Sequence, residues 1–128
     1  MEGINESNVF VTGNTVIDAL MLSIELADKK IDGQIDLLKK ITSKEKRIIL
    51  VTGHRRENFG KGFENICSAI LEISKNDDLE IIYPVHLNPN VKNIVHQKLG
   101  GISNIHLIEP LNYPAFTWIM NNSYIILT

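Results

Sequence analysis

Two hydrophobic spacings alternate along most of this chain. Short continuous apolar runs predict strands buried on both faces, over residues 48–52, 80–85, 105–108 and 124–127. Between these runs, apolar residues recur at helical spacing and predict helices over residues 63–71, 89–99 and 113–120. The predicted order is βαβαβαβ. Because parallel strands need crossover connections of this kind, the pattern indicates an α/β fold of Rossmann-like type, a parallel sheet with flanking helices.

The residues before the first predicted strand follow the helical spacing. Its apolar positions are Ile17, Leu20, Met21, Ile24 and Ala27. They predict a helix that Asn14 or Thr15 caps and that Gly33 ends. Residues 35–41 predict a further short helix. We therefore divide the chain into residues 1–42, with an entering strand, helices and a linker, and residues 43–128, a partial Rossmann-like domain that we expect to belong to a larger protein.

Bulk composition narrows the classes of partner. The 128 residues are 44% hydrophobic, which is enough for one core. Their net charge of -2 gives no general attraction to nucleic acid or to a membrane. No apolar run approaches the roughly 20 residues of a membrane span, and the N-terminus lacks the pattern of a signal peptide. The single cysteine, Cys67, lies on a predicted helix and fits a packing role in a reducing compartment. We therefore expect a cytoplasmic protein.

Candidate site residues follow three of the predicted strands. His54, Arg55 and Arg56 come after the first strand, His86 after the second, and Glu109, Pro110 and Leu111 after the third. In open parallel sheets the ligand crevice lies outside the carboxyl ends of the strands, so these residues are expected to share one edge. His96 and His106 lie within elements and are interpreted as structural or solvated.

The segment of residues 54–61 has the composition of an anion site. Three permanent positive charges stand against the single carboxylate of Glu57, beside Gly60 and Gly62 and a helix start. Arginine forks and helix N-terminal amides suit a phosphate or diphosphate. A solvated loop in which Glu57 pairs with an arginine explains the same spacing, and both interpretations stay open at this point. The segment matches neither a Walker loop nor a dinucleotide fingerprint, and no Cys/His spacing predicts a metal site.

Three strings of the sequence carry a family resemblance. VTGNTVIDAL (residues 11–20), VTGHRRENFGKGFENIC (residues 51–67) and YPVHLNPNV (residues 83–91) resemble the non-hydrolysing UDP-N-acetylglucosamine 2-epimerases in order and spacing. The resemblance implies a glycosyltransferase-B-like architecture, in which substrate binds between two Rossmann-like domains. It makes residues 43–128 part of the second, UDP-binding domain.

The resemblance also implies an activity and site residues. Members interconvert UDP-N-acetylglucosamine and UDP-N-acetylmannosamine by eliminating UDP and adding it back, with no cofactor, and they resemble homodimers. His54 matches a catalytic residue at the diphosphate, where Arg55 also belongs to the substrate site. Leu111, through its backbone, and Phe116 match residues near the uracil, although the periodicity alone explains Phe116 equally well as core. Arg55 and His86 match positions of a second, activating UDP-N-acetylglucosamine.

Parts of the family pattern are absent from this chain. The Ser-Gly-Gly loop and glutamate that follow the last strand in the family lie beyond Thr128, and the acid and base carboxylates belong to the other domain. We therefore expect the isolated chain to be inactive and the parent protein to be active. The alternatives are a hydrolysing epimerase, which releases free N-acetylmannosamine, a glycosyltransferase half-domain and a non-catalytic module that binds nucleotide sugars.

Overall fold

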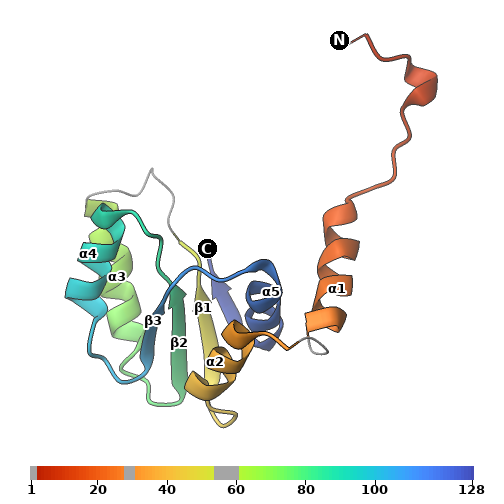
Figure 1. Cartoon of the computed structure of the whole chain (residues 1–128). Helices are drawn as coiled ribbons and strands as arrows, with labels where there is room; N and C mark the ends of the chain where they lie inside the picture. The colour runs from red at the N-terminus through yellow and green to blue at the C-terminus, as the bar shows by residue number, and fades with distance from the viewer. Residues whose placement is uncertain (1–2, 28–30, 54–60) are drawn as a thin grey trace.

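The fold is a parallel sheet between two layers of helices (Figure 1). The computed structural model describes residues 3–27, 31–53 and 61–128. Its strands are β1 (Arg47–Val51), β2 (Leu79–Pro84), β3 (Ile105–Ile108) and β4 (Ile125–Leu127). They pair in the order β3-β2-β1-β4, and every pairing is parallel. This confirms the Rossmann-like α/β fold and the four strands predicted from the apolar runs.

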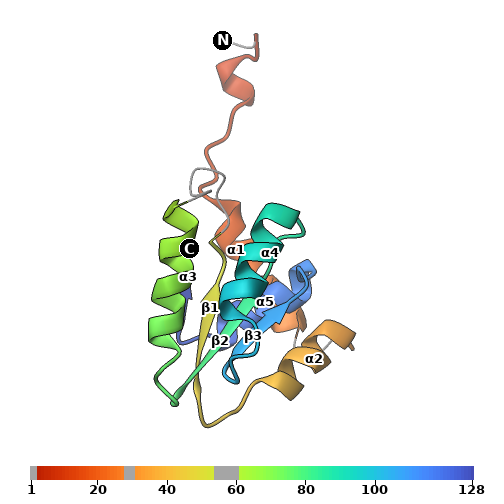
Figure 2. The ribbon, with the colours of Figure 1, turned by 90° about the vertical axis from the view of Figure 1, so that its left-hand side faces the viewer.

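Helices cover both faces of the sheet. The described elements that are not strands are the short 3-10 helix η1 (Glu6–Asn8) and the α-helices α1 (Thr15–Ala27), α2 (Gly33–Ile41), α3 (Lys61–Ile73), α4 (Pro89–Leu99) and α5 (Tyr113–Asn122). α3 and α4 lie on one face, and α2 and α5 lie on the other, where α1 packs against α5 (Figures 1 and 2). The connection from β1 to β3 therefore uses one face, and the return to β4 uses the other.

The strands are nearly continuously apolar because each face of the sheet has its own core. Ile49 and Val51 of β1 pack in the cluster that holds α3 and α4, whereas Ile48 and Leu50 pack with α2 and α5. Successive side chains of a strand point to opposite faces, so both sets are buried. Cys67 is buried in the first cluster, and burial raises the pKa of its thiol, which keeps it protonated. The predicted packing role of Cys67 is confirmed.

The N-terminal part differs from the prediction in two respects. α1 ends at Ala27, and Gly33 begins α2 instead of ending α1. The reason is Asp32, whose carboxylate accepts hydrogen bonds from the backbone N–H groups of Gln34 and Ile35 and so caps α2. In the described part of residues 1–42 the structure has η1, α1 and α2 but no strand, so the entering strand is not seen. The division between residues 42 and 43 stays a prediction; α2, which precedes it, packs on the sheet.

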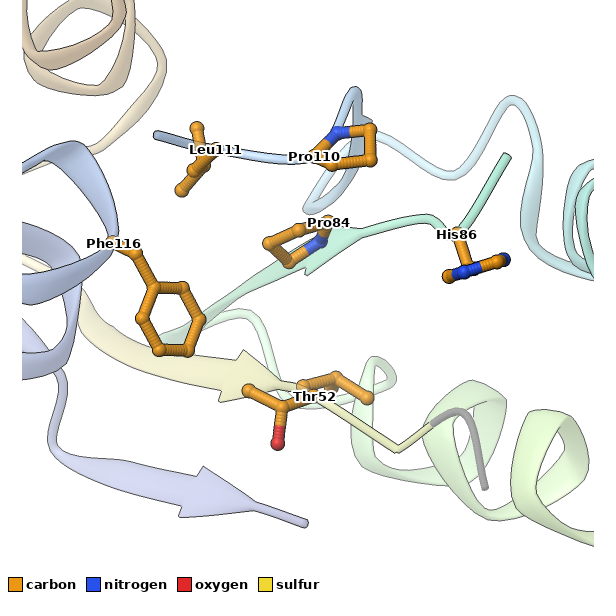
Figure 3. A pocket seen from close by; sticks show the side chains of 7 residues that line it. Thr52, Pro84, His86, Pro110, Leu111 and Phe116 are labelled. Atoms are coloured by element: carbon orange, nitrogen blue, oxygen red, sulfur yellow. The ribbon is translucent and has the colours of Figure 1, made fainter. Parts of the chain in front are cut away.

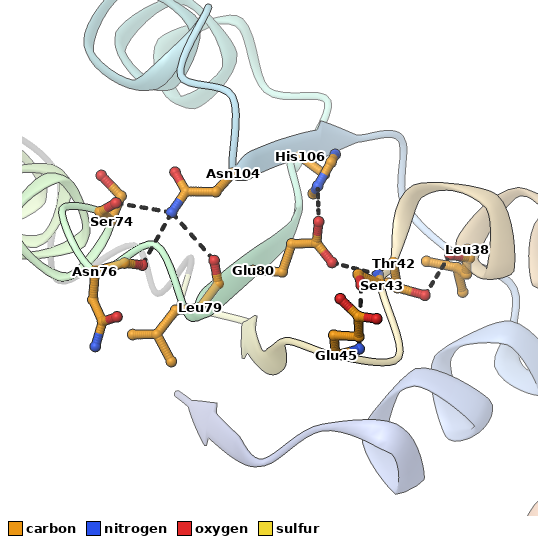
Figure 4. A network of polar contacts seen from close by, with 10 residues as sticks. All are labelled: Leu38, Thr42, Ser43, Glu45, Ser74, Asn76, Leu79, Glu80, Asn104 and His106. Carbon is orange, nitrogen blue, oxygen red and sulfur yellow. Dashed lines mark hydrogen bonds and ion pairs between the residues drawn. The ribbon is translucent and has the colours of Figure 1, made fainter.

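Polar side chains tie the ends of β2 and β3 to their neighbours (Figure 4). The Asn104 amide donates to the backbone carbonyls of Ser74 at 2.8 Å and Leu79 at 3.2 Å. Buried Glu80 accepts from the backbone N–H of Ser43 at 2.6 Å, and its other oxygen lies 3.5 Å from His106 Nε2. His106 therefore makes a structural contact, as its place within a strand indicates.

β4 forms one edge of the sheet. Among the described strands it pairs only with β1, and Tyr124 and Ile125 beside that edge are 67% and 47% exposed. An apolar edge strand of this kind favours association with another strand. Association of this chain through β4 stays a prediction. None of the described helices has the length and apolar content that crossing a membrane requires.

Candidate functional site

A hollow opens at the carboxyl ends of the strands (Figure 3). Its volume is about 190 Å³, and we call it the carboxyl-edge hollow. The side chains labelled around it are Thr52, Pro84, His86, Pro110, Leu111 and Phe116. They come from the ends of β1, β2 and β3 and from the first turns of α5. The structure therefore places a hollow at the edge where open parallel sheets bind ligands.

The start of α5 sets the position of Phe116. Asn112 is the N-cap of this helix, and its side-chain oxygen accepts a hydrogen bond from the Ala115 N–H at 2.9 Å. Its backbone carbonyl accepts from the Phe116 N–H at 2.9 Å. Pro114 in the first turn supplies a backbone angle that suits a helix start. These bonds fix the first turn, so the Phe116 ring faces the hollow on the side opposite His86 (Figure 3).

Leu111 and His86 lie at the same edge as Phe116. Leu111 directly precedes the cap of α5 and lines the hollow beside Pro110 (Figure 3). His86 follows β2, and its Nδ1 accepts a hydrogen bond from the Asn88 backbone N–H at 3.1 Å. The structure thus brings together three of the residues predicted to share an edge, His86, Pro110 and Leu111.

The remaining predicted site residues divide into two groups. His54, Arg55, Arg56 and Glu57 lie outside the described residues, and their roles stay predictions. Glu109 is described: its carboxylate lies 3.3 Å from Lys92 Nζ, and both side chains are largely exposed. Glu109 is therefore in a surface ion pair.

Tyr83 is a residue at this edge that the sequence interpretation missed. Its ring is fully buried in the core, and its hydroxyl donates a hydrogen bond to the Gly53 carbonyl at 2.9 Å. The bond holds the backbone just past the end of β1, where the chain leads to His54. The sequence signal was a tyrosine within an otherwise aliphatic strand, because a buried tyrosine hydroxyl needs a hydrogen-bond partner. Burial raises the pKa of Tyr83 to about 12.

The raised pKa of Tyr83 makes the stability of this chain depend on alkaline pH. An unfolded tyrosine titrates near 10, and the folded one near 12. Below pH 10 Tyr83 is protonated in both the folded and the unfolded state, and its contribution to the free energy of unfolding is fully present. As the pH rises toward 12 the unfolded state loses its proton first, so this contribution to stability is lost. Between about pH 8 and about pH 11 we expect the free energy of unfolding to fall by about 1 kcal/mol through Tyr83. Urea unfolding should show a smaller fall for Tyr83→Phe, and an equal fall would contradict the assignment.

The chemistry of the hollow suits an uncharged planar group. Leu111, Phe116 and two prolines supply apolar surface. A site for a drug-sized ligand usually encloses about 300 Å³ or more, so the hollow has room for one end of a nucleotide and not for a whole nucleotide sugar. Among the described residues there is no cluster of three or more His, Cys, Asp or Glu side chains that could hold a metal ion.

Comparisons with known proteins found similar chains of known family. The chain is 47% identical to the UDP-N-acetylglucosamine 2-epimerase of Salmonella borreze, over 99% of this chain and 34% of that protein. A crystal structure of UDP-GlcNAc 2-epimerase from Neisseria meningitidis bound to UDP-GlcNAc matches with a TM-score of 0.82 and 42% identity, over 98% of this chain and 34% of that one. MnaA of S. aureus in a co-structure with UDP matches with a TM-score of 0.75 and 39% identity, over 98% and 33%.

These relatives have the glycosyltransferase-B-like fold that the resemblance implied, and the chain spans about a third of their length. The sequence model of the family described as UDP-N-acetylglucosamine 2-epimerase matches residues 1–128. A match over every residue, together with the shared fold, shows that the chain belongs to the UDP-N-acetylglucosamine 2-epimerase family.

Proposed function

We propose that the full-length protein containing this chain interconverts UDP-N-acetylglucosamine and UDP-N-acetylmannosamine, and that the chain supplies part of its UDP site. In the elimination step the C2 proton leaves to a base, the bond from C1 to the phosphate oxygen breaks, and UDP departs. Re-addition of UDP to C1 and of a proton to the other face of C2 gives the epimer. No cofactor is consumed. The observation that carries the proposal is the carboxyl-edge hollow in a chain whose relatives were crystallised with UDP or UDP-GlcNAc.

Each predicted site residue has a role in this proposal. The uracil lies in the hollow against Phe116 and meets backbone groups of Leu111. The diphosphate lies toward His54 and Arg55, because they follow closely in sequence after Thr52, which lines the hollow. His54 then stabilises the negative charge that develops on the departing UDP. Arg55 and His86 contact a second, activating UDP-N-acetylglucosamine.

The rest of the full-length protein completes the site. The acid and base carboxylates lie in its other domain, and the glutamate and Ser-Gly-Gly loop that hold ribose and phosphate follow the last strand of this chain. We also infer a cytoplasmic homodimer that uses neither nucleic acid nor membrane as a partner; this rests on the family resemblance and on the composition, with its net charge of -2.

Product analysis tests the proposal. Full-length protein incubated with UDP-N-acetylglucosamine should yield UDP-N-acetylmannosamine, approaching a fixed ratio from either direction, whereas this chain alone should show no turnover. Proton NMR separates the two UDP-sugars from free N-acetylmannosamine. Free sugar plus UDP would identify a hydrolysing enzyme instead. UDP binding without turnover by the full-length protein would identify a binding module, and turnover by this chain alone would contradict the assignment of the carboxylates to the other domain.

A further inference from the structure

We propose that Gln34 is a positioning residue that sets the direction of the Leu111 carbonyl and thereby the preference of the site for uracil. The inference rests on the proposed function, because it takes the carboxyl-edge hollow as the uracil site. Gln34 lies on α2, and neither its spacing nor its residue type pointed to this site. Its contacts with the segment that follows β3 carry the argument.

α2 and α5 are joined through their caps. Asp32 caps α2 with one carboxylate oxygen, and its other oxygen accepts a hydrogen bond from the Asn112 side-chain amide at 2.9 Å. Gln34 Oε1 accepts a hydrogen bond from the Asn112 backbone N–H at 2.7 Å. Asn112 is itself the cap of α5. The start of α2 thus holds the start of α5 at two points, although the residues are about 80 positions apart in sequence.

The hydrogen bond between the Asn112 N–H and Gln34 orients the peptide unit that contains the Leu111 carbonyl. The carbonyl of Leu111 and the N–H of Asn112 belong to one planar peptide group, in which they point in opposite directions. Fixing the N–H on Gln34 therefore fixes the direction of the carbonyl. The other end of this segment is held independently, because the Ile108 carbonyl accepts from the Val85 N–H at 2.8 Å. Between these two points, Pro110 and Leu111 line the hollow.

In this proposal the Leu111 carbonyl faces the base in the hollow, and a carbonyl fixed there distinguishes pyrimidine bases. Uracil carries a proton on N3 and donates a hydrogen bond there, whereas N3 of cytosine has no proton and accepts one. A carbonyl oxygen only accepts. It therefore pairs with uracil and leaves two acceptors facing each other in the case of cytosine. Released from Gln34, the peptide unit is free to turn, and the site should lose part of its preference for UDP over CDP.

The test is a titration of the full-length protein with UDP and with CDP. Gln34→Ala should raise the Kd for UDP by about three- to tenfold, the range expected for one hydrogen bond. The Kd for CDP should rise less, so the ratio of the Kd for CDP to the Kd for UDP falls. KM for UDP-N-acetylglucosamine should rise with the Kd while kcat changes little, because the base is remote from the reacting carbons. Gln34→Glu keeps an acceptor oxygen and should restore the preference for UDP.

Matched variants separate this role from a general loss of stability. Gln97→Ala removes an exposed glutamine in the last turn of α4 and should leave both Kd values unchanged. Gln34→Ala leaves the Asp32 cap in place, so the melting temperature should stay close to that of the wild type. Unchanged UDP and CDP affinities in a folded Gln34→Ala protein would overturn the positioning role alone. Wild-type protein that fails to bind UDP would overturn the proposed function, and the inference with it.

Discussion

Replacing His54 with alanine in the full-length protein is expected to lower kcat/KM for UDP-N-acetylglucosamine by about 100- to 1,000-fold, the usual effect of removing one donor that stabilises a developing negative charge. His54 directly follows Gly53, whose carbonyl accepts a hydrogen bond from the Tyr83 hydroxyl. In the proposed function His54 is the donor at the diphosphate, where negative charge develops as UDP departs. Steady-state kinetics over a range of substrate concentrations measures the change.

His96→Ala is the matched control for this variant. His96 is an exposed histidine in the last turn of α4, so its loss should leave kcat/KM unchanged. UDP titration of the His54→Ala protein shows how much of the effect is ground-state binding and how much appears only in the transition state. A folded His54→Ala protein with wild-type kcat/KM would remove His54 from the mechanism.

Phe116→Ala should raise the Kd of the full-length protein for UDP by about 10- to 100-fold. The ring lies on the apolar side of the hollow (Figure 3). Stacking of a base on an aromatic side chain contributes about 1–3 kcal/mol by alanine substitution. Isothermal titration calorimetry with UDP measures the loss, and inorganic diphosphate, which lacks the base, should bind the variant and the wild type equally.

Phe116→Tyr keeps the aromatic face and should retain most of the affinity for UDP. Phe116 also packs against the core cluster of α2 and α5, so the melting temperature of each variant must be compared with the wild type. If Phe116→Ala is folded and binds UDP as tightly as the wild type, Phe116 is only a helix-core residue, which is the other interpretation that its periodicity supports.

The regular elements could be predicted because their residues act through local rules. Residues 105–108 form a short run that is apolar except for His106 and is bounded by polar residues, and β3 occupies that range. Asn88 and Pro89 mark the start of α4, where a capping residue and a proline in the first turn favour a helix. Gly33 was misassigned because glycine is common after a helix end, whereas here the cap formed by Asp32 decides that a helix begins.

The edge of the site could be predicted, but its internal contacts could not. Parallel strands bring their carboxyl ends together, so the residues after β2 and β3 had to share an edge with those after β1. That rule placed His86, Pro110 and Leu111 in one region, whereas Phe116 was expected there only from the family resemblance. The hydrogen bonds from the Tyr83 hydroxyl to Gly53 and from the Asn112 N–H to Gln34 join residues 30 and 78 positions apart, and no local pattern encodes such a pair.

A crystal structure of the full-length protein with UDP tests the central claim most directly. We expect the uracil in the carboxyl-edge hollow, in contact with the Phe116 ring and the Leu111 backbone, and the diphosphate beside His54. UDP bound elsewhere in the protein, with the hollow between Phe116 and Leu111 left without a base, would contradict the account.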